Sequence, residues 1–263
     1  IGTVTDRCGN IITGISGGAL SLCASSLTID TALSGTSIFF KTDALAVNAA
    51  VTSTVGGATI ENFTSGTSIG LGGGTGDLNI SDVELAQFSI PVGQAFTLGS
   101  ANAGAFSTNS VTFNTDNNVI LSGATIAIDN GLTLGNTRSL ELRASGTAAD
   151  IVTQVTTGTG ITAGDLLLTG TGTGAFRLAN TLNDVTNLAG NVQGAVQYID
   201  FNTLNISGAL TSNNNNITIF APNGITVPNA IDAGTGIVTI AADAVDLTAL
   251  VTGNGGVTLI PFT

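Results

Sequence analysis

The chain has 263 residues and a formal net charge of −12, from 17 acidic against five basic side chains. Apolar residues make up 43% of it, which excludes intrinsic disorder, whereas charged residues make up only 8%, against about 25% in an ordinary soluble domain. With so few basic residues the chain has no basic patch for the phosphates of a nucleic acid, so we expect no nucleic-acid partner. It also has no run of about 18 apolar residues, so we expect no membrane insertion.

The N-terminal residues contain a candidate disulfide. Cys8 and Cys23 are the only cysteines, and an even, closely spaced pair is typical of a secreted domain. Closing a loop of this length contributes roughly 3 kcal/mol in the chain-entropy picture. Two unlinked buried thiols are the alternative. The opening "IGTVTDRCGN" lacks a charged segment followed by an apolar core, so we expect a processed or excised segment.

The N-terminal third repeats short apolar runs at an interval of eighteen residues. Each run alternates apolar and polar residues, which is the pattern of a half-buried strand. The runs are Leu20/Leu22, Leu27/Ile29 and Leu33, which return as Ile38/Phe40, Leu45/Val47 and Val51. Thr59/Ile60 and Leu78/Ile80 are expected to continue the first series. Helix formers are scarce between the runs, which excludes an α-helical bundle.

Three stretches depart from this repeat. In residues 79–90, Ser81 and Glu84 have the spacing of a helix capping box, with Val83 and Phe88 expected on one side of a helical turn. Residues 181–192 show helical spacing as well. We interpret both as corners that bulge out of the coil, with a partner-binding knob as the alternative. "GLGGGTGDLNI" (70–80) is interpreted as a flexible glycine corner and not as a calcium-binding repeat.

The C-terminal part repeats at an interval of about twenty residues. Ile217/Ile219 recur as Ile237/Val238/Ile240 and again as Val257/Leu259. A fixed period of this size, with three short strands and three Gly/Asn/Asp corners per period, predicts an all-β, parallel β-helix solenoid with about 18–20 residues per coil and about thirteen coils. A β-sandwich and a porin-like barrel are the alternatives. A sandwich does not require every third strand to match, and a barrel needs alternating segments of about ten residues and aromatic girdles, whereas the chain has one Tyr and no Trp.

The irregular stretches resemble phrases of a known family. "LNISDVELAQFSI" (78–90) is similar to the "LSDAEL" phrase of filamentous-haemagglutinin-type bacterial exoproteins, and "NTLNDVTNLAGNVQGAVQYIDFNTLNISG" (180–208) resembles their "NDVDTLA…NTSGALSYTDADALTVG" phrase. "APNGIT" (221–226) is a weaker match to their "NPNGI" motif. The resemblance covers roughly residues 58–210. It implies a right-handed β-helix in a large surface or secreted adhesin exported by two-partner secretion, and it carries over no catalytic residue.

The sequence offers little for catalysis. The chain has no His, so the usual Ser or Cys triad is unavailable, and its acidic residues are dispersed. The closest acidic pairs are Asp82/Glu84 and Asp243/Asp246, neither with a neighbouring base. We therefore expect no enzyme, no cofactor and no metal site. Threonine-rich segments such as "TGTGTG" (169–174) do not recur once per coil, so no regular threonine row for ice binding is expected.

We therefore predict one β-solenoid domain over residues 1–263, either a segment of a longer rod or one subunit of a fibre. The expected function is an extracellular structural or adhesive rod, secreted or on a bacterial cell surface. An ice-binding solenoid or a polysaccharide-processing β-helix enzyme is the alternative. Expected partners are other copies end to end or adjoining repeats of a longer chain. A glycan or protein of a host or cell surface is a further candidate.

Overall fold

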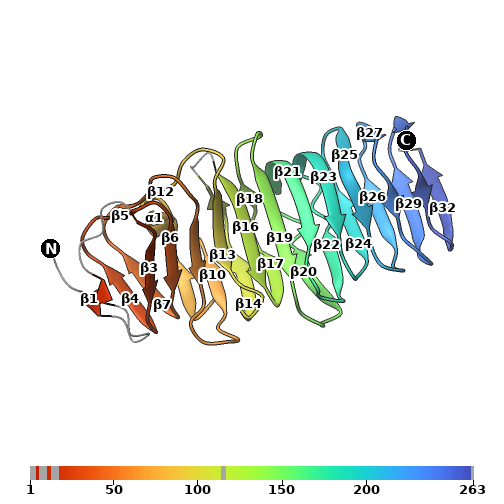
Figure 1. The fold of residues 1–263 in the computed structure, drawn as a ribbon. Coiled ribbons are helices and arrows are strands. Elements are labelled where there is room, and N and C mark those ends of the chain that lie inside the picture. Colours follow the sequence, from red (N-terminus) through yellow and green to blue (C-terminus); the bar gives the residue numbers. More distant parts are fainter. Residues whose placement is uncertain (1–3, 6–10, 13–17, 114–116, 262–263) are drawn as a thin grey trace.

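The chain folds into a β-solenoid of about 11 turns with about 21 residues per turn. The computed structural model describes residues 18–113 and 117–261, with the backbone of residues 4–5 and 11–12. Strands stack from the N-terminal to the C-terminal end of an elongated molecule (Figure 1). The predicted fold class is confirmed. The predicted coil of 18–20 residues was slightly too short, and thirteen coils were too many because the coils lengthen after the first turns.

The largest sheet runs along the rod and continues around a corner wherever one long strand pairs with two consecutive strands of a neighbouring turn. Its main path stacks eleven strands in parallel: β3 (Leu20–Cys23), β6 (Ile38–Lys41), β9 (Ala58–Glu61), β13 (Ala95–Gly99), β16 (Asn118–Gly123), β19 (Ser139–Ala144), β21 (Ile161–Thr169), β23 (Asp184–Asn191), β25 (Leu204–Thr211), β27 (Ile225–Val227) and β30 (Val245–Leu247). Four short strands join it: β15 (Val111–Thr112), β18 (Leu132–Thr133), β28 (Ile231–Asp232) and β31 (Val251–Thr252).

A second sheet of ten strands forms another side. In order along the rod it contains β11 (Leu78–Ile80), β10 (Ile69–Leu71), β14 (Ala105–Thr108), β17 (Thr125–Ile128), β20 (Asp150–Gln154), β22 (Ala175–Leu178), β24 (Val196–Ile199), β26 (Ile217–Phe220), β29 (Ile237–Ala241) and β32 (Gly256–Ile260). Two small sheets complete the first turns: β4 (Ser26–Ile29) with β7 (Ala44–Val47), and β5 (Leu33–Gly35) with β8 (Val51–Ser53) and β12 (Phe88–Ser89). Strands β1 (Val4–Thr5) and β2 (Ile11–Ile12) pair antiparallel.

Matching apolar side chains lie above one another, as the repeat predicts. Leu20 pairs with Ile38 and Leu33 with Val51, both at eighteen residues. In the C-terminal turns the file runs Ile217, Val238, Val257, so Ile237 does not belong to it and is 40% exposed. The solenoid interval there is twenty-one residues and then nineteen, which explains why a fixed interval of twenty selected the wrong neighbour.

Residues 69–89 form an insertion within one turn. The chain leaves β10, reverses through a glycine-rich loop, and returns as β11, which pairs in parallel with β10 and lies next to β7. Leu78 and Ile80 therefore belong to the second sheet and do not continue the first series. The loop is tightly packed, because a Cβ at Gly74 would lie 2.3 Å from the Ser107 carbonyl oxygen. The stretch is a glycine corner, as predicted, and at Gly74 the lack of a side chain is required by close packing.

The predicted capping box is confirmed, but the packing around it differs. Helix α1 (Asp82–Leu85) begins at Ser81, whose hydroxyl accepts the Glu84 N–H while the Glu84 carboxylate accepts the Ser81 N–H. Val83 is 71% exposed and Phe88 is 3% exposed, so the two do not share a face. Within the described residues, no helix is long and apolar enough to cross a membrane.

Residues 181–192 are not a bulging corner. Most of this stretch is β23, in which Val185 and Leu188 are fully buried. The three-residue spacing arises because two successive residues, Thr186 and Asn187, are not buried, which interrupts the alternation of β23 between Val185 and Leu188. A local irregularity of a strand had the same apolar spacing as a helical turn.

Candidate functional site

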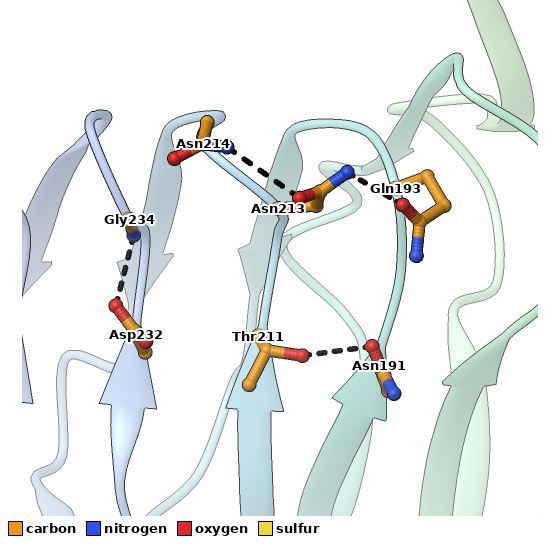
Figure 2. Close-up of a pocket in the computed structure, with 7 residues that line it drawn as sticks. All are labelled: Asn191, Gln193, Thr211, Asn213, Asn214, Asp232 and Gly234. Carbon is orange, nitrogen blue, oxygen red and sulfur yellow. Dashed lines mark hydrogen bonds between the residues drawn. The ribbon is translucent and has the colours of Figure 1, made fainter.

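A polar groove of about 290 Å³ lies at one corner of the C-terminal turns. The corner is where the chain passes from the large sheet into the ten-stranded sheet, between β23 and β24, β25 and β26, and β28 and β29. Its lining is formed by seven residues: Asn191, Gln193, Thr211, Asn213, Asn214, Asp232 and Gly234. Figure 2 shows them as two rows that run from turn to turn along the rod.

The first row is set by strand register. Asn191, Thr211, Asp232 and Thr252 are direct partners on successive strands, so their outward side chains lie one turn apart. The Thr211 hydroxyl donates to Asn191 Oδ1 at 3.0 Å, and the Thr252 hydroxyl donates to Asp232 Oδ1 at 2.9 Å. Backbone pairing thus places an amide, two hydroxyls and a carboxylate in one line.

The second row lies on the turns that follow these strands. Asn213 Nδ2 donates to Gln193 Oε1 at 2.6 Å, and Asn214 Oδ1 accepts the Thr235 N–H at 3.1 Å. Asn213 and Asn214 have positive φ values of 42° and 69°. Asparagine tolerates this left-handed backbone better than other non-glycine residues, so it can turn the corner and still present an amide.

Asp232 gives the groove its charge. The Gly234 N–H donates to its carboxylate at 2.9 Å, and together with the Thr252 hydroxyl this hydrogen bond lowers the pKa of Asp232. The carboxylate is therefore ionised at neutral pH. The seven lining residues include no basic side chain and no apolar one. The groove can accept and donate hydrogen bonds, but it offers no nucleophile–base pair.

The residues singled out in the sequence lie elsewhere. Cys23 ends β3, but Cys8 lies outside the described residues, so their disulfide stays a prediction. Glu84 serves as a structural acceptor, because its carboxylate also receives the Val47 N–H at 3.2 Å. Asp243 lies in the corner after β29, and Asp246 is exposed on β30.

Two surface features were missed by the sequence reasoning. The groove had a visible signal, because Asn191, Thr211 and Asp232 recur at intervals of twenty and twenty-one residues, like the apolar runs. The other feature is a threonine file on the ten-stranded sheet, where Thr218, Thr239 and Thr258 are direct partners on β26, β29 and β32. The expectation that no threonine row forms was therefore wrong for these three turns.

Comparison with known proteins adds no relative: no family model, no curated protein and no solved structure matches the chain. Among the described residues, no group of three or more His, Cys, Asp or Glu side chains is arranged to hold a metal ion.

Proposed function

We propose that the chain is an extracellular structural rod of a bacterial surface or secreted filament, with adhesive contacts and no catalytic role. The observation that carries the proposal is the uninterrupted stack of about 11 turns around an aliphatic core. At ~4.8 Å per turn, such a stack is a rod on the order of 50 Å long. Hydrogen bonds between successive turns make it stiff, so it can hold contact points at fixed distances from each other.

Sequence and side-chain chemistry support this proposal. The phrases at 78–90 and 180–208 resemble those of filamentous-haemagglutinin-type exoproteins. Several acidic side chains serve the fold: Asp43 accepts hydrogen bonds from Thr67 and two backbone N–H groups, and Asp150 pairs with Arg177. Acids held in this way tie turns to each other, which suits a structural role.

The two ends of the described stack differ in exposure. Leu20 and Leu22 in β3 are 2% and 3% exposed, whereas Val257 and Leu259 in β32 are 44% and 49% exposed. Among the described strands, β32 pairs with β29 and has no partner on its other side. Unpaired strand edges bind further strands. We propose that another layer covers β32, either adjoining repeats of a longer chain or a second copy.

Light scattering over a concentration series and negative-stain electron microscopy test this proposal. We expect rods that associate through their ends as concentration rises. Leu259→Lys places a charge on the open end and is expected to keep the rods monomeric. Thr258→Lys is the matched control. Thr258 is the neighbour of Leu259 on β32, and its side chain points to the opposite face of the sheet. Monomers at every concentration would refute self-association, and compact particles would refute the rod.

A second candidate function rests on the threonine file. Thr218, Thr239 and Thr258 form a regular row of hydroxyl and methyl groups, a surface that can order water as ice-binding solenoids do. The row spans three turns and is one residue wide. Thermal hysteresis of the purified chain tests this candidate function. A strong effect in the wild type that is lost in Thr239→Lys would establish ice binding, and the absence of an effect in the wild type would refute it.

A further inference from the structure

We propose that the groove at the corner of the C-terminal turns binds a neutral, hydroxyl-rich ligand, namely a segment of an uncharged oligosaccharide lying along the rod. This inference deepens the adhesive part of the proposed function by naming the class of ligand. It does not depend on assembly of the rods into longer fibres.

The first argument is the unused hydrogen-bonding capacity of the lining. Within the described residues, Asn191 Nδ2 has no protein acceptor, and Asp232 Oδ2 has no protein donor because both of its hydrogen bonds reach Oδ1. The amide of Asn214 donates only through a long contact of 3.5 Å to Asn213. Free donors and a free acceptor thus line one hollow. A sugar hydroxyl donates and accepts at once, so it can satisfy both kinds.

The second argument is that other ligand classes fit poorly. The lining has no apolar side chain, so an apolar ligand would gain little from burial there. An anionic ligand would meet the Asp232 carboxylate and a chain of net charge −12. A cation would find only one carboxylate in the lining. Of these ligand classes, an uncharged polyol fits the lining best. Because the two rows run along the rod, we expect the ligand to lie along the rod as well.

The third argument is that the groove is formed in advance. The Gln193–Asn213 hydrogen bond of 2.6 Å fixes two amides, and the Asn215 side chain ties its turn to the Gln193 carbonyl at 2.9 Å. Thr211 is fixed on Asn191. Side chains that are held before binding lose little freedom on binding, which favours recognition by a few polar contacts. Strand pairing spaces successive residues of the first row by ~4.8 Å per turn, so an oligosaccharide that lies along the rod can contact several turns.

Calorimetric titration of the monomeric chain with cellohexaose, maltohexaose and chitohexaose tests the inference, with polygalacturonate as the anionic comparison. We expect at least one neutral hexasaccharide to bind with a Kd of about 1 mM or tighter, and polygalacturonate to bind at least tenfold more weakly. The double variant Asn213→Gly/Asn214→Gly removes two amides but keeps a backbone that accepts positive φ. Its affinity is expected to fall at least tenfold.

One control variant and one further groove variant complete the test. Asn48→Ala removes an exposed amide that bonds Asp30 in the first turns, far along the chain from the groove, and should leave affinity unchanged. Asp232→Asn keeps the shape of the side chain but removes its charge, and should also weaken binding. The inference is overturned if no neutral hexasaccharide binds, if the double variant binds as well as the wild type, or if Asn48→Ala loses as much. Rod length and association are measured separately, so either proposal can fail alone.

Discussion

A carboxylic acid lies in the core where an aliphatic residue would be expected. Asp200 is fully buried beside Tyr198, whose hydroxyl donates to Asp200 Oδ2 at 2.6 Å. The Val185 and Asn202 N–H groups donate to the same carboxyl, at 3.1 and 2.8 Å. Burial raises the pKa of Asp200 despite these hydrogen bonds, and burial followed by the nearby Asp200 charge raises the pKa of Tyr198 well above its usual value.

This acid makes stability depend on pH in a defined direction. The folded pKa of Asp200 is above its unfolded value, so the favourable contribution of the protonated form is complete below the unfolded pKa and is lost as pH rises through the folded pKa. The free energy of unfolding of the wild type, minus that of Asp200→Asn, should therefore decrease as pH rises from about 3 towards neutrality. Urea unfolding of both proteins at several pH values measures this difference. A constant or rising difference would contradict the prediction.

At the scale of elements, the insertion at 69–89 shows how a strand is added without breaking the stack. Strand β11 occupies a position between β7 and β10, and α1 then leads the chain on to β12. The return from β10 to β11 is possible because the glycine loop passes directly over the neighbouring backbone. A side chain at Gly74 would collide with the backbone of Ser107 on β14.

Substitution of Gly74 tests this close approach. A methyl group there would lie 2.3 Å from the Ser107 carbonyl oxygen, a backbone atom that cannot move away freely. We expect Gly74→Ala to lower the free energy of unfolding by about 2 kcal/mol or more, in the range of other overpacked sites. Gly135→Ala is the control, since its nearest neighbour would be the Arg138 side chain at 3.8 Å. Equal denaturation midpoints for the two variants would show that the loop is loosely packed.

Much of the element pattern could be predicted from the sequence, because inward positions alternate with outward ones and recur turn after turn. The pairs Leu20/Ile38 and Leu33/Val51 are examples. The position of β11 could not be predicted, since its alternating run fits either sheet equally well. The strand that contains Val185 could not be predicted, because two successive non-buried residues interrupt its alternation before Leu188. The groove does not follow from the apolar repeat, because its lining residues are polar.

At the scale of the whole molecule, stability is distributed along the stack. Each turn contacts mainly its two neighbours, so the end turns are held less firmly than the central ones. The residues of β32 are all exposed, while β19 lies between β16 and β21 and carries the fully buried Leu140 and Leu142.

Hydrogen exchange measures this gradient. In dilute solution, where the rods are not associated, we expect the amides of β32 to exchange at least tenfold faster than those of β19, because β32 is the last described strand of its sheet. Mass spectrometry of proteolytic fragments after timed deuterium labelling gives the comparison within a single sample. Equal protection at the two strands would mean that the stack opens as one cooperative unit.

The outward file of the ten-stranded sheet passes through Thr153, Arg177, Gln197 and Thr218, one per turn, so hydroxyl, guanidinium and amide side chains follow one another along it. Its members need not match from turn to turn, because their side chains point away from the core. The molecule thus presents outward positions at a fixed spacing along the rod, and each can be substituted separately. Probes attached at two such positions would be separated by about 4.8 Å for every turn between them, a built-in calibration for distance measurements.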